Sequence, residues 1–275
     1  MKFTKMQGAG NDYIYVNAMQ EHIDDPEALA VKLSDRHFGV GSDGLVLIMN
    51  SDIADFRMRM FNSDGSEAEM CGNASRCIGK YVYDKGLTSK TSISLETKAG
   101  LKGLELSLEG GLVRTVRVDM GEPVLEPSQV PVSVPGDLAI HVPLKIGKEV
   151  YEINCVSMGN PHAVIFTHEI DALNLPELGP RFEFNEIFPK RTNTEFVEVL
   201  TSGHAKMRVW ERGAGETLAC GTGACAVLVA GVLCGRLDRK AVIDLRGGSL
   251  QIAWNEQDNH VYMTGEAVTV FEGEV

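Results

Sequence analysis

Residues 58–72, MRMFNSDGSEAEMCG, and residues 207–221, MRVWERGAGETLACG, are two versions of one pattern, and they decide the fold predicted for this chain. A shift of 149 residues, without a gap, superposes five identical positions: Met58/Met207, Arg59/Arg208, Glu67/Glu216, Cys71/Cys220 and Gly72/Gly221. The same shift places Gly10-Asn11 over Gly159-Asn160. Because the matches cluster at polar and reactive residues rather than along the whole halves, we infer an old internal duplication.

The length of the chain and its proline distribution predict two domains. At 275 residues and 44% apolar composition, the chain is long enough to build two cores. Residues 120–143 carry five of the ten prolines and little helical pattern, as expected of an extended crossover or an edge-strand segment. We therefore predict a first domain over residues 1–120 and a second over 121–265, with a C-terminal strand, 266–275, able to return to the first.

Each half has the pattern of a sheet with one principal helix. Alternating apolar residues over 95–108, 112–120, 152–158 and 260–271 predict strands. Residues 74–86 predict a helix that is buried on one side and ends at Gly86, and residues 224–235 a helix that is apolar all round and ends near Gly235. A further amphipathic helix is expected over 25–39, from Asp25 or Pro26 to Gly39. The fold class is α+β: two pseudo-symmetric lobes, each a mostly antiparallel sheet wrapped around a central helix.

Charge and cysteine content exclude several classes of function. The net charge is −12 with no block of Lys or Arg, which argues against binding to nucleic acid or to an anionic membrane. No apolar run approaches the ~20 residues of a membrane span or forms a signal peptide, so we expect a cytoplasmic protein. Six cysteines are too few for a disulfide-rich secreted domain, and their spacing fits no zinc motif. We expect thiols and no metal.

Cys71 and Cys220 each precede a predicted helix, where backbone N–H groups lack intrahelical acceptors. This position favours a thiolate and can lower the pKa of a thiol from about 8.5 by one or more units, so that it becomes usable as a base. The glycine that follows each cysteine lets a ligand approach the backbone. Gly72-Asn73 and Gly221-Thr222 are therefore predicted to bind a carboxylate.

Two such half-sites facing each other across the cleft between the lobes would place one thiol on each side of a carbon that bears a carboxylate. An enzyme that inverts a stereocentre without a cofactor needs this arrangement, because one group removes a proton while another returns one to the opposite face. The simpler interpretation is that free cysteines are buried apolar residues, and we accept it for Cys77, Cys155, Cys225 and Cys234. A Cys71–Cys220 disulfide is expected only as a side reaction of the same geometry.

Seven motifs in this chain resemble those of the diaminopimelate epimerase family, end to end and in the same order: KMQGAGNDYIYVN, DRHFGVGSDG, FNSDGSEAEMCGNASRC, DMGEP, VSMGNPHAV, RTNTEFV and VWERGAGETLACGTGACA. The resemblance implies a cofactor-independent epimerase that interconverts LL- and meso-diaminopimelate in lysine and peptidoglycan precursor synthesis, and a homodimer. It implies that Cys71 and Cys220 are catalytic and that His162 and Glu211 adjust the thiol pKa values. Its substrate-binding positions are Asn11, Asn62, Gly72, Asn73, Asn160, Asn193, Glu211, Arg212, Gly221 and Thr222.

Three positions, in two motifs, depart from the family pattern. Gly44 stands where many members carry Gln, so a side-chain contact with the distal end of the substrate cannot come from this residue. Ala74 and Ser75 replace Gly and Ala in the segment after Cys71, where small residues remain and little effect on the chemistry is expected.

Three alternatives fit parts of the pattern. A proline or hydroxyproline racemase would share ACGTGACA, but such enzymes carry a His after the first Cys-Gly, where this chain has Asn73. A histidine racemase is harder to exclude, and its substrate would not need Arg212 for a distal carboxylate. A two-lobed amino-acid binding protein would need neither thiol.

Overall fold

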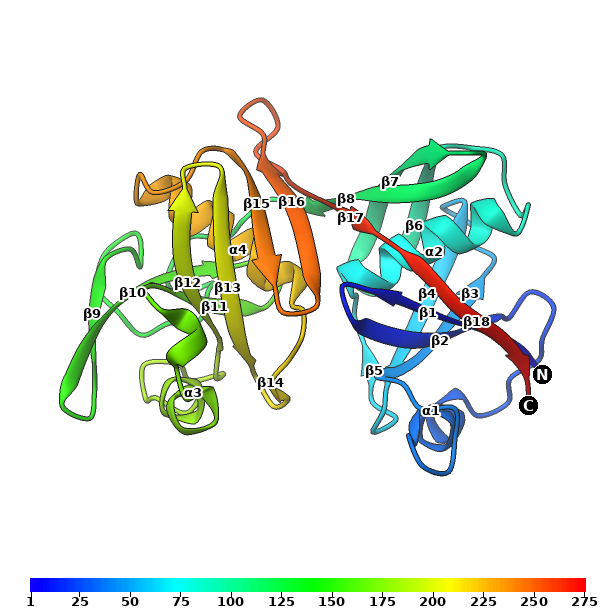
Figure 1. The fold of residues 1–275 in the computed structure, drawn as a ribbon, viewed down its shortest axis with the longest axis horizontal. Helices are drawn as coiled ribbons and strands as arrows, with labels where there is room; N and C mark the ends of the chain where they lie inside the picture. Colours follow the sequence, from blue (N-terminus) through cyan, green and yellow to red (C-terminus); the bar gives the residue numbers. More distant parts are fainter. The chain divides into compact units, whose positions relative to one another are not determined.

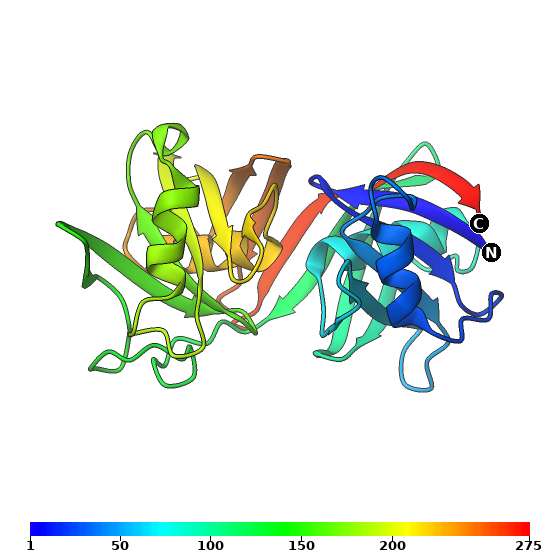
Figure 2. The same ribbon diagram turned by 90° about the horizontal axis from the view of Figure 1, so that it is seen from below.

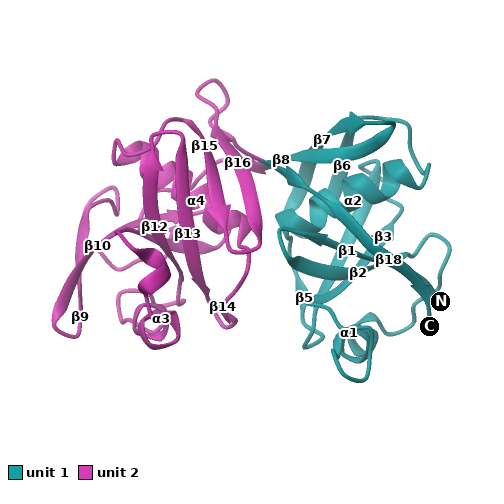
Figure 3. Ribbon diagram, viewed as in Figure 1, with its two compact units in different colours: residues 1–119, 264–275 teal, residues 120–263 magenta.

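The computed structural model describes all 275 residues, and the chain divides into two compact units. Unit 1 comprises Met1–Asp119 and Thr264–Val275, and unit 2 comprises Met120–Met263 (Figure 3). The chain therefore passes from one unit to the other twice, and its last strand lies with unit 1.

Unit 1 contains a strand-rich sheet and two helices (Figure 1). In chain order its elements are β1 (Lys2–Gly8), β2 (Asn11–Asn17), α1 (Pro26–Ser34), β3 (Gly44–Met49), β4 (Phe56–Asn62), β5 (Glu67–Ala68), α2 (Gly72–Asp84), β6 (Ser92–Thr97), β7 (Gly100–Glu109), β8 (Leu112–Gly121) and β18 (Val268–Glu274). The β2–β3 and β4–β6 pairs are parallel. The β18–β1, β1–β2, β3–β4, β4–β5, β6–β7 and β7–β8 pairs are antiparallel.

Unit 2 has a similar composition of elements. They are β9 (Val142–Ile146), β10 (Glu149–Ser157), β11 (Pro161–Phe166), the short 3-10 helix η1 (Ile170–Ala172), α3 (Leu175–Glu183), β12 (Asn193–Thr201), β13 (His204–Glu211), β14 (Gly215–Glu216), α4 (Gly221–Leu233), β15 (Lys240–Leu245), β16 (Gly248–Trp254) and β17 (Val261–Glu266). The β11–β12 and β13–β15 pairs are parallel. The β9–β10, β10–β11, β12–β13, β13–β14 and β15–β16 pairs are antiparallel.

The order of strand pairings is the same in the two units. From β1 to β7 the pairs run antiparallel, parallel, antiparallel, antiparallel, parallel and antiparallel, and the pairs from β10 to β16 follow the same series. One helix follows the second strand of each series, and another follows the short strand β5 or β14. The fold is a mixed, strand-rich one with four α-helices.

The helices α2 and α4 are each 13 residues long and begin directly after a cysteine. They start two or three residues earlier than the sequence pattern predicts, because Gly72 and Gly221 already have helical geometry. Both end in a Schellman motif around a glycine of positive φ, Gly86 and Gly235, as expected. None of the helices is long and apolar enough to span a membrane.

The surroundings of the two cysteine-led helices differ from the sequence prediction on one point. Helix α4 is buried almost all round and contacts β10, β11, β12, β15 and β16, as its apolar composition predicts. The first two turns of α2 are also buried on every side, from Gly72 to Gly79, although a one-sided burial was predicted. A Cβ at Gly79 would lie 2.9 Å from Leu106 Cδ2, so α2 packs closely on β7.

The two outer helices also correct the sequence prediction. Helix α1 begins as expected, with Asp25 accepting a hydrogen bond from the Ala28 N–H at 3.0 Å. It ends at Ser34 rather than near Gly39, because the Asp35 carboxylate accepts from the His37 and Phe38 N–H groups and stabilises a turn instead. Helix α3 was not predicted at all, since Gly179 and Pro180 lie inside it.

The strands next to α1 are buried on both faces. Figure 2 shows α1 in front of the sheet of unit 1. The core cluster next to α1 includes Ile14 and Val16 of β2 and Leu45 and Leu47 of β3. The residues between them, such as Tyr15, point to the other face and are also buried. Strands covered on both faces are apolar without alternation, which is the pattern of DYIYV and GLVLIM.

The proline-rich segment 120–143 is a turn-rich covering of unit 2 rather than an extended crossover. It forms one bridge, from Val124 to Ser157, and has no strand until β9. Val130, Val132 and Ala139 are buried in the same cluster as Phe182 of α3. The segment therefore closes one side of the core of unit 2.

Gly179 lets α3 lie directly on the Trp210 indole, and this contact generates a stability prediction. A Cβ at this position would lie 2.3 Å from two ring atoms of Trp210, whose Nε1 is held by Glu183 at 2.8 Å. We expect Gly179→Ala to lower the free energy of unfolding by about 1–3 kcal/mol, although alanine favours helix. Urea unfolding measures this, with Gly203→Ala, whose Cβ meets no atom within 4 Å, as the control. Equal midpoints for both variants would contradict the tight contact.

Candidate active site

In unit 1 Cys71 occupies the N-cap position of α2, and its thiol contacts one of the predicted asparagines instead of capping the helix. Cys71 has an extended backbone at the N-cap position and is partly buried. Its Sγ lies 3.4 Å from Asn11 Oδ1, which also accepts a hydrogen bond from Asn73 Nδ2 at 3.2 Å. The N–H groups of Gly72 and Asn73 lie in the first turn, where helix geometry provides no intrahelical acceptor. The structure therefore brings Cys71, Gly72, Asn73 and Asn11 together.

A charged network fixes Asn11 from behind. Asn11 Nδ2 donates to Asp43 Oδ2 at 2.8 Å. Arg36 donates to both Asp43 and Asp12, at 3.0 and 2.9 Å, and Lys5 forms an ion pair with Asp12 at 2.6 Å. This network was not predicted, although Lys5 and Asp12 lie in the motif KMQGAGNDYIYVN and Arg36 and Asp43 in DRHFGVGSDG. It orients the amide so that its oxygen faces the thiol.

Asn62 and Gly44 lie opposite each other on neighbouring strands. Asn62 is the last residue of β4, and its Nδ2 donates to Ser66 Oγ at 3.0 Å. A Cβ at Gly44 would lie only 2.0 Å from the Phe61 carbonyl oxygen. The strands are therefore too close at this point for any side chain at residue 44 without a shift of the backbone.

In unit 2 Cys220 occupies the N-cap position of α4 in the same way, but its thiol accepts hydrogen bonds. Cys220 is 5% exposed, and its Sγ accepts from the Gly223 N–H at 3.4 Å. The Thr222 hydroxyl lies 3.5 Å from the same sulfur. Gly221 and Thr222 are the first two residues of the helix, equivalent to Gly72 and Asn73.

A buried histidine and a buried glutamate lie beside Cys220. His162 and Glu195 are both 0% exposed, and His162 Nδ1 lies 2.7 Å from Glu195 Oε1. The other ring nitrogen, Nε2, lies 3.0 Å from Asn160 Oδ1. Because buried ionisable groups require partners, the pair fixes the orientation of the imidazole. Asn160 and His162 therefore act as one hydrogen-bonded unit.

The electrostatics around Cys220 differ from the sequence prediction. Burial, together with the carboxylates of Glu211 and Glu195, raises the pKa of the Cys220 thiol well above its ordinary value. The Thr222 hydroxyl and the Gly223 N–H oppose this effect without reversing it. Burial also raises the pKa of Glu211, against hydrogen bonding by Thr217 and the nearby His162. The expected lowering at a helix N-terminus is therefore wrong for Cys220, because desolvation and two carboxylates outweigh it.

His162, Glu195 and Cys220 also form a set of potential metal ligands. One ligand atom from each residue lies within 4.8 Å of the others, and all three residues are buried. Both ring nitrogens of His162 already have hydrogen-bonding oxygens at 2.7 and 3.0 Å. The local geometry is thus that of a proton-handling cluster, in which a metal would have to displace existing hydrogen bonds.

The remaining predicted residues of unit 2 form a support at the end of β13. Asn193 Oδ1 accepts from the Arg212 N–H at 2.9 Å, and its Nδ2 donates to the Pro161 carbonyl at 2.8 Å. Arg212 is exposed, with its guanidinium donating to the Lys190 carbonyl at 3.0 Å. Asn193 therefore positions the chain that carries Arg212, and the Arg212 side chain can reach a ligand from the surface.

The duplicated glutamates of the opening pattern have a structural partner in each unit. Glu67 forms an ion pair with Arg59 at 2.7 Å, and Glu216 forms one with Arg208 at 2.8 Å. Each pair joins the short strand before the cysteine to its neighbouring strand. The repeated Glu-x-x-x-Cys-Gly spacing thus reflects how the hairpin is held in front of the helix rather than a catalytic role for the glutamate.

Glu195 is the residue beside a thiol that the sequence argument missed. It lies in RTNTEFV, a stretch used only as a motif, within a strand whose residues 193–197 are all buried. A buried acidic residue is rare unless it is paired, but the stretch NTEFV is half polar and gives no sign of its burial in the sequence.

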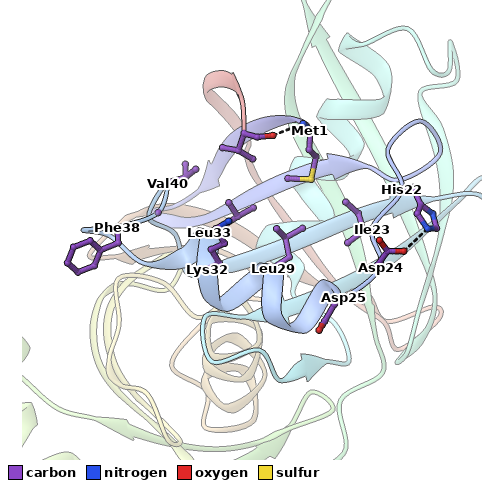
Figure 4. A pocket seen from close by; sticks show the side chains of 12 residues that line it. Met1, His22, Ile23, Asp24, Asp25, Leu29, Lys32, Leu33, Phe38 and Val40 are labelled. Atoms are coloured by element: carbon purple, nitrogen blue, oxygen red, sulfur yellow. Dashed lines mark hydrogen bonds and ion pairs between the residues drawn. The ribbon is translucent and has the colours of Figure 1, made fainter.

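A separate pocket of about 550 Å³ lies in unit 1 and contains none of these residues (Figure 4). Its lining includes Ile23, Leu29 and Leu33 around α1, and Phe38 stands at its rim with 93% of its surface exposed. The two predicted catalytic cysteines lie instead at the N-termini of α2 and α4.

Comparison with known proteins gives one family. The sequence model described as "Diaminopimelate epimerase" matches residues 3–126 and 154–270. Curated proteins named diaminopimelate epimerase include one from Acetivibrio thermocellus, 60% identical over 100% of this chain and 98% of its own. One from Methanococcus maripaludis is 59% identical, covering 100% of this chain and 99% of its own. One from Desulfovibrio desulfuricans is 61% identical, covering 100% and 98%.

Solved structures share the fold at low sequence identity. A probable proline racemase from Agrobacterium radiobacter, with bound carbonate, has a TM-score of 0.71 at 15% identity and covers 100% of this chain and 92% of its own. A phenazine biosynthesis protein of the PhzF family from Bacillus anthracis has a TM-score of 0.69 at 17% identity, covering 100% and 98%. At such identities the likeness concerns the fold alone.

The Arg208–Glu216 pair generates a pH-dependent stability prediction. Burial opposes ionisation, but Arg208 and Arg246 lower the pKa of Glu216 below its ordinary 4.5. A lowered folded-state pKa stabilises the protein above the unfolded value, and the stabilisation is lost as the pH falls below about 4.5 through the folded value. Glu216→Gln should therefore lower the free energy of unfolding by about 1–3 kcal/mol at neutral pH.

This difference between the variant and the parent protein should shrink as the pH falls, which urea unfolding at several pH values measures. Glu105→Gln, in an exposed pair with Arg117, is the matched control and should cost less than about 1 kcal/mol. A Glu216→Gln effect that stays constant down to acid pH would rule out the ion pair as its source.

Proposed function

The chain belongs to the diaminopimelate epimerase family, and we propose that it interconverts LL- and meso-diaminopimelate by a two-base mechanism with Cys71 and Cys220 as the acid/base thiols. The observation that carries the proposal is the equivalence of the two cysteines. Each is the N-cap of a buried 13-residue helix that follows a short strand, in units with the same series of strand pairings.

The equivalence of the two cysteines has an evolutionary origin and a role in the reaction. We propose that two pseudo-symmetric lobes arose by duplication and that each contributes one thiol to the reaction at a single carbon. The repeated pairing order, the Schellman motifs and the duplicated Arg–Glu ion pairs support the duplication. Placement of both thiols at one carbon is the geometric requirement of the mechanism.

The reaction transfers one proton in and one proton out. A thiolate on one side removes the α-proton, and the C–H electron pair is left on the carbanion, delocalised into the α-carboxylate. The opposite thiol then donates its proton to the other face of the carbon, so that it becomes the thiolate. The enzyme ends with the two protonation states exchanged, and the reverse reaction uses the same groups in opposite roles.

Backbone donors would supply the stabilisation of the carbanion. The first-turn N–H groups of Gly72-Asn73 and Gly221-Thr222 belong to buried helix N-termini, where preorganised donors are most effective at stabilising developing negative charge. This arrangement replaces the electron sink of a cofactor, so we propose that none is required.

The distal half of the substrate carries a second carboxylate and ammonium group. Arg212 is exposed and anchored only through its backbone and one carbonyl contact, which leaves guanidinium donors for that carboxylate. Glu211 and the side-chain oxygens of Asn11, Asn62, Asn160 and Asn193 are the proposed acceptors for the ammonium groups. We place the enzyme in the cytoplasm, in lysine and peptidoglycan precursor synthesis, as a homodimer.

A related cofactor-independent racemase for histidine or proline is the second candidate, because the fold is shared with a probable proline racemase. The choice of substrate tests it. The assay follows exchange of the α-proton in heavy water. We expect turnover with LL-diaminopimelate and none with L-histidine or proline. Exchange with L-histidine alone would replace the proposed substrate, and tight binding without any exchange would indicate a binding protein.

Substitution of each thiol tests the mechanism directly. Cys71→Ala and Cys220→Ala should each lower the rate of epimerisation by at least about 10³-fold, because each removes one of the two proton-transfer groups. Cys77→Ala, a buried thiol of α2 one turn and a half further on, is the matched control and should retain most of the activity. The two single variants should still catalyse elimination from a β-halogenated analogue, which requires one base. Near-normal epimerisation by either would refute the two-base scheme.

A further inference from the structure

The two half-sites differ in the residues that surround their thiols, and the difference follows the duplication. Shifted by 149 residues, His162, Glu195 and Glu211 of unit 2 correspond to Tyr13, Val46 and Asn62 of unit 1. The strand registers agree, since Ala163–Thr194 and Val164–Glu195 in β11–β12 match Ile14–Leu45 and Tyr15–Val46 in β2–β3. Three ionisable groups next to one thiol thus correspond to a tyrosine, a valine and an asparagine in the other unit.

Glu195 lies directly beside the first turn of α4. Its Oε1 is 2.7 Å from His162 Nδ1 and would lie 2.6 Å from a Cβ at residue 223. The same Cβ would be 3.2 Å from Cys220 Sγ. Gly223 therefore leaves the space in which the carboxylate and the sulfur approach each other, and its equivalent in unit 1 is Ala74. Glu195 Oε2 is buried and makes no hydrogen bond.

The charged and titratable groups that face Cys220 come from three strands. They are His162 on β11, Glu195 on β12 and Glu211 on β13, and the Cys155 thiol on β10 interacts with Glu195 from the far side. Helix α4 contributes the Thr222 hydroxyl and the Gly223 N–H. In unit 1 the charged residues Asp12, Asp43, Lys5 and Arg36 pair with one another around Asn11 rather than at the sulfur.

We propose that Glu195 is a positioning residue that makes the two thiols inequivalent: together with His162, it keeps Cys220 as the protonated member of the pair in the substrate-free enzyme. The carboxylate holds the imidazole by Nδ1 and places negative charge near the sulfur, so a thiolate at Cys220 is disfavoured. Cys71 has an amide oxygen at 3.4 Å, and Val46 stands at the position equivalent to Glu195, so Cys71 is assigned as the resting base.

This inference rests on the proposed acid/base role of the two cysteines and adds an order to it. The substrate stereoisomer whose α-proton faces Cys71 reacts with the resting enzyme directly. The other stereoisomer requires the opposite protonation states, so Cys220 must first release its proton to solvent and Cys71 must take one up from solvent.

Alkylation by iodoacetamide tests the proposal on the wild-type enzyme, without any substitution. The extent of reaction is measured by mass spectrometry at several pH values, separately for Cys71 and Cys220. Only the thiolate reacts, so the midpoint of each curve reports ionisation of that thiol. We expect the Cys220 midpoint to lie at higher pH than the Cys71 midpoint. Coincident midpoints, or the reverse order, would overturn the proposal.

Glu195→Gln then isolates the carboxylate, since glutamine preserves the shape and can still accept from the imidazole. The Cys220 midpoint should move to lower pH, with about tenfold faster alkylation below the midpoint for each pH unit, while the Cys71 midpoint stays in place. The apparent pKa that Cys220 contributes to the pH profile of kcat/KM should also move to lower pH. Glu198→Gln is the matched control, because it makes the same chemical change on β12 with its side chain on the other face.

The outcomes separate this inference from the proposed function. An unchanged or raised Cys220 midpoint in Glu195→Gln, or an equal shift in Glu198→Gln, overturns the role of Glu195 even if both thiols are essential. Epimerisation that survives in Cys220→Ala overturns the two-base function, whatever the alkylation curves show. If Glu195→Gln does not fold, the order of the two wild-type midpoints still decides the protonation state of Cys220.

Discussion

The placement of each thiol at the N-cap of a buried helix is the constraint on which the site depends. A helix whose first turn is enclosed must leave N–H groups of that turn without intrahelical acceptors, and the residue at the cap lies among them. In α4 one of these groups is satisfied by the thiol itself, through Gly223. The remaining donors at Gly221 and Thr222 are available to a ligand because the sheet covers the rest of the helix.

Holding the cap requires that the chain arrive from a fixed direction. The hairpins β4–β5 and β13–β14 provide this, and a half-buried Arg–Glu ion pair locks each of them. At the other end, glycines of positive φ terminate the two helices with the same hydrogen bonds. Elements that carry no chemistry are thus the ones that the two units keep most alike, because they determine where the sulfur lies.

The residues in contact with the sulfurs are where the two units differ. An amide oxygen faces Cys71, whereas a buried imidazole and two carboxylates lie around Cys220. Gly223 and Ala74 are equivalent positions in the two helices. Only the glycine leaves room for the Glu195 carboxylate, because a Cβ there would lie 2.6 Å from Glu195 Oε1. Similar strand pairing in the two units therefore carries two thiols with unlike surroundings, and our proposal assigns them different protonation states in the resting enzyme.

The sequence alone determined the family, the positions of both cysteines, and the cysteine-led helices with their terminal glycines, because these depend on local spacing and on a repeat visible as identical letters. It placed the end of α1 too late and missed α3, where an Asx turn and the Trp210 ring decide the outcome. Only the tertiary structure placed Glu195 against His162 and Cys220, residues far apart in the chain that parallel strand pairing brings together. Burial, which no local pattern measures, then reversed the acidity expected for a thiol at a helix N-terminus.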